Sequence, residues 1–116
     1  PLMGSSYFPD DSAIADFFKI TVFDNQSLVQ FIHRNLAYLI VVLYFYILFF
    51  VIKYGNINLR IPILVIGISL LFQILLGIFT ILSGVKILYA SLHQINSIFI
   101  ILSTLYFLYI IKPQIN

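Results

Sequence analysis

The sequence predicts an all-α integral membrane protein with three transmembrane helices and a polar N-terminal segment. Hydrophobic residues make up 62% of the 116 residues and charged residues only 9%, with a mean hydropathy of +1.10. A soluble domain usually carries about 25% charged residues. Three long stretches without charge are each able to span a bilayer. The net charge of +2 is small and scattered, so we expect no nucleic-acid partner.

Residues 1–26 form the predicted extramembrane segment, which holds all four acidic residues of the chain: Asp10, Asp11, Asp16 and Asp24. Its proline and glycine residues predict an irregular start, and the apolar spacing of residues 12–23 predicts a short interfacial helix. The segment lacks the basic and then apolar pattern of a cleavable signal peptide. Because the chain begins with Pro1, we expect a fragment or a processed product.

The first predicted span covers residues 28–54. The 18 residues 35–52, between Arg34 and Lys53, are uncharged and nearly all apolar. Ser27 is of a residue type that caps helix N-termini, so we expect it to be the N-cap.

Two further uncharged stretches of 25 residues each, 61–85 and 87–111, predict spans at 62–83 and 86–111. Pro62 suits the first turn of the second span. The three spans make up a predicted transmembrane domain over residues 27–116.

Short connections join the predicted spans. Residues 55–58 form a turn, Ser83 and Gly84 end the second span, and Pro113 closes the third. Three helices make only a thin core, so we expect partner helices from elsewhere.

Basic residues near the span ends predict the orientation. Lys53, Arg60 and Lys112 fall on one side of the membrane, and Lys19 and Lys86 fall on the other. This marginal excess predicts an outer N-terminal segment, with both histidines of the chain near the outer leaflet.

Those two histidines lie at matched depth in the first and third spans. His33 precedes Lys53 by 20 residues, and His93 precedes Lys112 by 19. At a rise of about 1.5 Å per residue, each imidazole is roughly 30 Å from that lysine, about one hydrocarbon thickness. The two spans run in the same direction. Two level imidazoles on parallel helices predict axial ligation of a haem iron.

A structural interpretation stays open, in which each histidine hydrogen-bonds across the bundle. Small residues flank the histidines at Ala37, Ala90 and Ser97. They leave room for a flat macrocycle, but they also suit ordinary close packing of helices in membranes. On the second span, Gln73 and Gly77 share a face that we interpret as a packing seam rather than a ligand site.

Arg34 follows His33 directly, and either pairs with a haem propionate or reaches the outer headgroups. Lys86 is a second propionate candidate, but a plain interfacial anchor is the stronger interpretation. The chain has no cysteine, which excludes disulfides, thiolate ligands and covalent haem attachment. No acidic residue lies within a span, so we assign no catalytic residue.

Three segments in order resemble the haem A synthase family. Residues 23–34 read FDNQSLVQFIHR, residues 73–85 read QILLGIFTILSGV, and residues 92–94 read LHQ. The resemblance covers essentially the whole chain. Each motif is modest alone, and their order makes the resemblance specific.

Members of that family have eight spans in two similar four-helix halves, each with a histidine pair. The resemblance implies that this chain forms most of the C-terminal four-helix bundle. There His33 and His93 would ligate the iron of a b-type haem that serves as cofactor, with Arg34 beside it. Gln30 stands where the other half, the substrate half, carries a glutamate, which favours the cofactor half.

The family oxidises the C8 methyl of haem O to the formyl group of haem A for cytochrome oxidase assembly. With three of eight spans, this chain is not expected to catalyse the reaction alone. The resemblance implies an electron relay working with the missing N-terminal half or other spans, and a homo-oligomer stays possible. The implied setting is membrane lipid, in a bacterial plasma membrane or, alternatively, a mitochondrial inner membrane.

Two other functions stay open from the residues alone. One is a stand-alone b-type cytochrome subunit, and the other is a haem-free membrane assembly protein.

Overall fold

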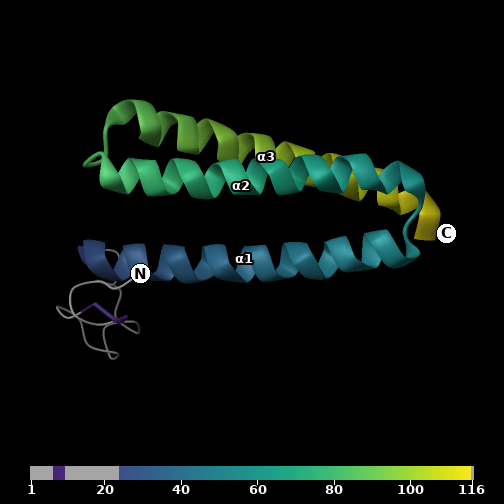
Figure 1. The fold of residues 1–116 in the computed structure, drawn as a ribbon, viewed down its shortest axis with the longest axis horizontal. Helices are drawn as coiled ribbons and strands as arrows, with labels where there is room; N and C mark the ends of the chain where they lie inside the picture. Colours follow the sequence, from purple (N-terminus) through teal and green to yellow (C-terminus); the bar gives the residue numbers. More distant parts are fainter. Residues whose placement is uncertain (1–6, 10–23, 116) are drawn as a thin grey trace. The chain divides into compact units, whose positions relative to one another are not determined.

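The computed structural model describes residues 7–9 and 24–115. Over these residues every regular element is helical, in the order α1 (Gln26–Tyr54), the 3₁₀ helix η3 (Ile57–Leu59), α2 (Arg60–Leu82) and α3 (Ile87–Ile115) (Figure 1). Three segments are long and apolar enough to cross a membrane: Gln26–Tyr54, Ile57–Leu82 and Ile87–Lys112. The all-α membrane fold is therefore confirmed. The interfacial helix predicted at 12–23 lies outside the described residues.

The chain divides into two compact units, residues 1–43 and 44–116. In the first unit, Pro9 and Leu28 have the most deeply buried side chains. The rings of Tyr7 and Phe8 each meet the ring of Phe31 edge-on, with 5.3 Å between ring centroids. Such edge-to-face pairs are a favoured aromatic geometry. They fasten residues 7–9 to the start of α1.

Helix α1 begins two residues before its predicted start. The Leu28 backbone N–H donates to Asn25 Oδ1 at 3.1 Å, so Asn25 caps the helix and the prediction of Ser27 as N-cap is wrong. Both residue types accept hydrogen bonds at helix N-termini. The local sequence therefore could not show which of the two residues is the N-cap. The path of the chain into the helix determines it.

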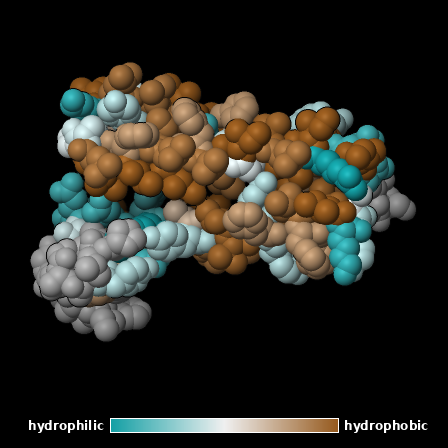
Figure 2. Space-filling model, in the orientation of Figure 1, coloured by the Kyte–Doolittle hydropathy of each residue, from teal (hydrophilic) through white to brown (hydrophobic). Residues whose placement is uncertain are grey.

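In the second unit, α2 and α3 lie side by side as an antiparallel pair (Figure 1). Buried apolar side chains gather where α2 begins and α3 ends, namely Val51, Leu59, Ile63, Ile66 and Phe107. Most other large apolar side chains of the three helices are exposed, and they cover most of the visible helix surface (Figure 2). This distribution suits a hydrocarbon environment rather than water.

The end of α2 is a hydrogen-bonded turn at the predicted place. The Val85 N–H donates to Thr80 O at 2.8 Å, and the Gly84 N–H donates to Ile81 O at 3.1 Å. This pair of bonds is the Schellman arrangement, which pairs carbonyls left over at a helix C-terminus. It needs a left-handed residue after the cap, and Gly84 supplies it with φ of +72°.

Helix α3 continues past Pro113 to Ile115, so the prediction that Pro113 closes the helix is wrong. A proline removes its own N–H donor, which costs most in the interior of a helix. In the last turn only one helical hydrogen bond, the one to the carbonyl of residue 109, is lost. Pro113 is therefore tolerated there. Pro62 lies in the first turn of α2, as predicted.

One close approach in the second unit depends on a glycine. The Tyr44 hydroxyl donates to Ile63 O at 3.1 Å. A Cβ atom added to Gly67 would overlap the Tyr44 hydroxyl oxygen, and it would come within 2.6 Å of Tyr44 Cζ. Gly67 therefore lets the Tyr44 side chain come close enough to α2 to reach the helix backbone.

We expect Gly67→Ala to lower the free energy of unfolding by about 1–3 kcal/mol, because the added methyl group displaces the Tyr44 ring. Titration of the chain from mild detergent into a denaturing detergent, followed by circular dichroism, measures the change. In a Tyr44→Ala background the same substitution should cost almost nothing. An equal cost in both backgrounds would contradict the steric explanation.

Candidate functional site

His93 is the centre of a polar cluster between α2 and α3. It lies about two turns into α3, and its imidazole is partly buried against α2. Its Nδ1 atom is 3.2 Å from the Gln73 backbone oxygen. Its Nε2 atom is 3.3 Å from Nε2 of the Gln73 side chain. One residue of α2 therefore contacts both ring nitrogens.

Asn96 settles which atom donates in each of these contacts. Its Nδ2 group donates to Gln73 Oε1 at 2.7 Å and to Ser69 O at 3.0 Å. With its oxygen turned to Asn96, the Gln73 amide presents its N–H₂ group to His93, so Nε2 of the imidazole must accept. The imidazole proton then lies on Nδ1 and donates to Gln73 O. The hydrogen bonds thus assign one neutral tautomer.

Gly77 provides the space for the imidazole. A Cβ atom at this position would lie 3.2 Å from His93 Cε1 and 3.6 Å from Nδ1. The first distance is tighter than most real contacts of this kind, so the ring would have to shift. The face of α2 that carries Gln73 and Gly77 is therefore more than the small-residue packing seam expected from the sequence.

The polar partners of His93 follow simple helical spacing. Ser69 and Gln73 are four residues apart on α2, and His93 and Asn96 are three apart on α3. Residues at these spacings share a helix face. We assigned no role to Ser69 or Asn96 from the sequence, although this spacing was a signal that would have found them. Which face of α2 meets α3 was not readable from a single chain.

His33 belongs to the first unit. It lies about two turns into α1, and its side chain is exposed. The two histidines are in different units, so their pairing across one ligand stays a prediction.

Arg34 is held by aromatic rings. Its guanidinium carbon lies 5.1 Å from the Tyr7 ring centroid and 5.8 Å from that of Phe31, within the range of cation–π attraction. Its Nη2 group donates to Tyr7 O at 3.3 Å, and the Tyr7 hydroxyl donates to Asn35 Oδ1 at 2.6 Å. No sequence motif predicted that Tyr7 contacts Arg34.

The donor set at His93 fits a haem. A ligating histidine usually donates from one ring nitrogen to a backbone carbonyl or carboxylate, which fixes the tautomer and turns the other nitrogen toward the metal. Here Nδ1 has that carbonyl, and Nε2 is the remaining ligand atom. The described residues contain no group of three or more His, Cys, Asp or Glu side chains. A porphyrin already supplies four nitrogens, so a haem iron needs only one or two protein ligands.

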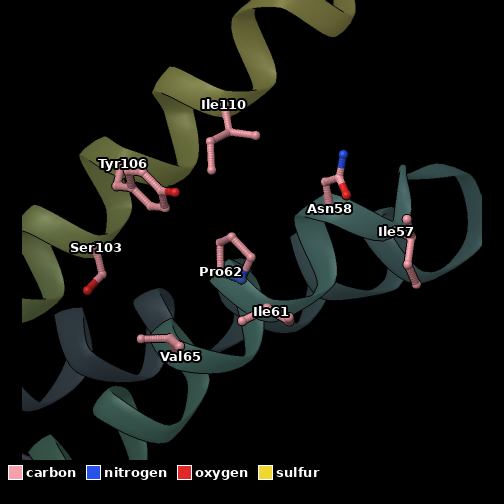
Figure 3. Close-up of a pocket in the computed structure, with 8 residues that line it drawn as sticks. All are labelled: Ile57, Asn58, Ile61, Pro62, Val65, Ser103, Tyr106 and Ile110. Atoms are coloured by element: carbon pink, nitrogen blue, oxygen red, sulfur yellow. The ribbon is translucent and has the colours of Figure 1, made fainter.

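A groove of about 500 Å³ lies farther along the same helix pair (Figure 3). Its lining comes from η3, the start of α2 and the end of α3: Ile57, Asn58, Ile61, Pro62, Val65, Ser103, Tyr106 and Ile110. The lining is mostly apolar and contains no histidine, so we assign it no part in the chemistry at His93.

The fold and these contacts define an α-helical, multi-pass membrane protein with a histidine fixed between two of its spans. The sequence model of the family described as cytochrome oxidase assembly protein matches residues 1–105. The chain belongs to that family. No solved structure matches it significantly.

Several curated relatives carry the name heme A synthase. The protein from Pelagibacter ubique is 41% identical over 117 residues, which cover 97% of this chain and 32% of the relative. The protein from Wolbachia pipientis wMel is 34% identical, over 98% of this chain and 31% of its own length. The protein from Rickettsia felis is 32% identical, over 98% and 34%. The chain thus spans about a third of the length of the relatives it matches.

We expect Gly77→Val to destabilise the α2–α3 pair by about 1–3 kcal/mol, because the added methyl groups force the His93 ring away from Gln73. Thermal unfolding in detergent micelles, followed by circular dichroism, measures the loss. Ile78→Val is the matched control, since Ile78 is exposed on the same helix. Equal stability of the two variants would show that the imidazole does not depend on this gap.

Proposed function

We propose that this chain holds a b-type haem between His33 and His93 and relays electrons in haem A biosynthesis for cytochrome oxidase assembly. The family description and the names of the relatives support the pathway. The observation that carries the haem assignment is the His93 tautomer, with Nδ1 on the Gln73 carbonyl and Nε2 as the ligand atom.

On the α3 side, three features prepare His93 to bind the haem iron. The Gln73 carbonyl accepts from Nδ1, which orients the imidazole and makes Nε2 a stronger electron donor. Gly77 leaves the ring room to stand against α2. The surrounding spans are predominantly apolar, which keeps water from the site.

On the α1 side, His33 is the second ligand and Arg34 is its charged neighbour. Both precede the long uncharged stretch of α1, so both lie near one end of the span. Contacts with Tyr7 and Phe31 position the guanidinium group. In this proposal Arg34 pairs with a haem propionate, a charge-assisted interaction that suits a planar guanidinium.

When bound, a haem with two histidine ligands supplies one-electron transfer and leaves no coordination position open for oxygen. We therefore assign this chain the relay and not the oxidation of the haem O methyl group. The remaining spans of the enzyme would hold that substrate, since this chain covers only a third of the relatives. The bacterial relatives support a bacterial plasma membrane as the location.

One observation favours a second candidate function. Both ring nitrogens of His93 contact Gln73, which is also what a purely structural histidine joining two helices would do. In that case the chain is a haem-free assembly protein, and loss of either histidine changes stability alone.

We expect a six-coordinate b-type signal in the reduced-minus-oxidised absorption spectrum of the chain after haem b is supplied. The sample is the chain in mild detergent, alone and co-expressed with the part of the Pelagibacter relative outside the matched third. His33→Ala and His93→Ala should each abolish the six-coordinate signal. Thr104→Val is the control, because the Thr104 hydroxyl donates within α3 to Ile100 O.

Absence of the signal from both samples would refute the haem proposal and favour the structural function. A signal from the chain alone, together with no association with the remaining spans, would instead indicate a stand-alone b-type cytochrome.

We expect Arg34→Gln to weaken haem retention by about fivefold, because a partly exposed ion pair contributes up to about 1 kcal/mol. Dilution of the loaded chain into haem-free micelles, followed by its absorption spectrum, gives the retention. Lys53→Gln removes a charge from the far end of α1 and should have no effect. If both variants lose haem equally, net charge and not a propionate contact is responsible.

A further inference from the structure

We propose that the side chain of Gln73 is a displaceable cap on His93 Nε2, which pairs this ring nitrogen in the haem-free chain until iron takes the place of the amide. The inference rests on the proposed function for its metal, but the cap itself is a property of the haem-free chain.

The two contacts of Gln73 differ in how freely they can change. The contact at Nδ1 comes from a backbone oxygen, which the α2 helix holds in place. The contact at Nε2 comes from the end of a flexible side chain. Iron binding at Nε2 must therefore remove the second contact and can keep the first. Gln73 thus orients His93 through its backbone oxygen and covers Nε2 with its side chain.

A cap is needed because His93 lies within a membrane-spanning segment. The imidazole is partly buried against α2, and a shielded polar atom without a partner costs free energy. With the cap closed, Nε2 has a donor from Gln73. The haem-free chain is thereby stabilised with both ring nitrogens of His93 paired.

Asn96 keeps one of its two hydrogen-bond acceptors on α2 when the cap opens. Its amide donates to Gln73 Oε1 and also to Ser69 O. When the Gln73 side chain leaves, Asn96 keeps its bond to the α2 backbone. The contact between Asn96 and Ser69 therefore remains after the Gln73 side chain has moved away. While the cap is closed, Asn96 acts as a latch, because its bond to Oε1 sets the orientation of the Gln73 amide.

A cap and a structural residue predict opposite effects on binding. Removing a cap makes the haem-free chain less stable, but it removes a competitor of the metal and tightens haem binding. Removing a residue that only positions the histidine weakens binding as well as stability. Gln73→Met separates the two cases, because methionine has a similar length and cannot donate a hydrogen bond.

The first experiment needs no haem. Nitrogen-15 spectra of histidine-labelled chain report the tautomer, and His33→Ala leaves His93 as the single labelled residue. We expect the Nδ1–H tautomer. In a Gln73→Met background we expect the Nε2 resonance to move, because it loses its donor, while Nδ1 stays protonated. An Nε2–H tautomer, or an unmoved Nε2 resonance, would overturn the cap.

The second experiment is a haem b titration of the full chain in detergent, with the Gln73→Met variant compared with the parent. The Kd should fall by about two- to tenfold, the net strength of one hydrogen bond. Asn96→Leu, which removes the latch, should act in the same direction and by less. Thr80→Val is the control, since the Thr80 hydroxyl donates to Leu76 O within α2.

An unchanged or raised Kd in Gln73→Met would overturn the cap and leave the haem assignment standing. A parent chain that takes up no haem, even beside the remaining spans, would overturn the haem assignment and the displacement by iron. The nitrogen-15 spectra would then still decide whether Gln73 covers Nε2.

Discussion

The need to pair polar groups within membrane spans determines how α2 and α3 contact each other at His93. Helices pair their own backbone groups, but polar side chains inside a span must find partners within the protein, on their own helix or on another. Gln73 and Asn96 do this for His93, through bonds that cross from α2 to α3. The same bonds select one tautomer of the imidazole. A requirement of the bilayer thus fixes the orientation of the imidazole.

Stability and chemistry occupy different parts of the α2–α3 pair. The buried apolar cluster, which includes Ile63 and Phe107, lies where α2 begins and α3 ends. The polar cluster at His93 lies beyond it, towards the turn at Gly84. Because packing is concentrated in one part, the contacts of His93 can change without dismantling the core. In the exchange of a hydrogen bond for a metal that we propose at His93, this separation would leave the core intact.

Much of the fold and part of the site were readable from the chain. The uncharged stretches predicted three helices, and the turn chemistry at Gly84 predicted the end of α2, because both depend on local composition. The sequence singled out His93 as an ionisable residue within a span. It did not assign Asn96 a role, since this depends on which face of α2 meets α3. It also did not find the contact between Arg34 and Tyr7, which depends on where residues 7–9 lie against α1.

By itself, the sequence determined the membrane class, the number of spans and the two candidate ligands, because hydropathy and residue type act locally along the chain. Only the tertiary structure decided that Asn25 caps α1, that Gln73 contacts both nitrogens of His93, and that Gly77 leaves space for the ring. These features depend on the approach of segments distant in sequence, or on the path of the chain into a helix. Side-chain spacing alone leaves several such arrangements equally possible.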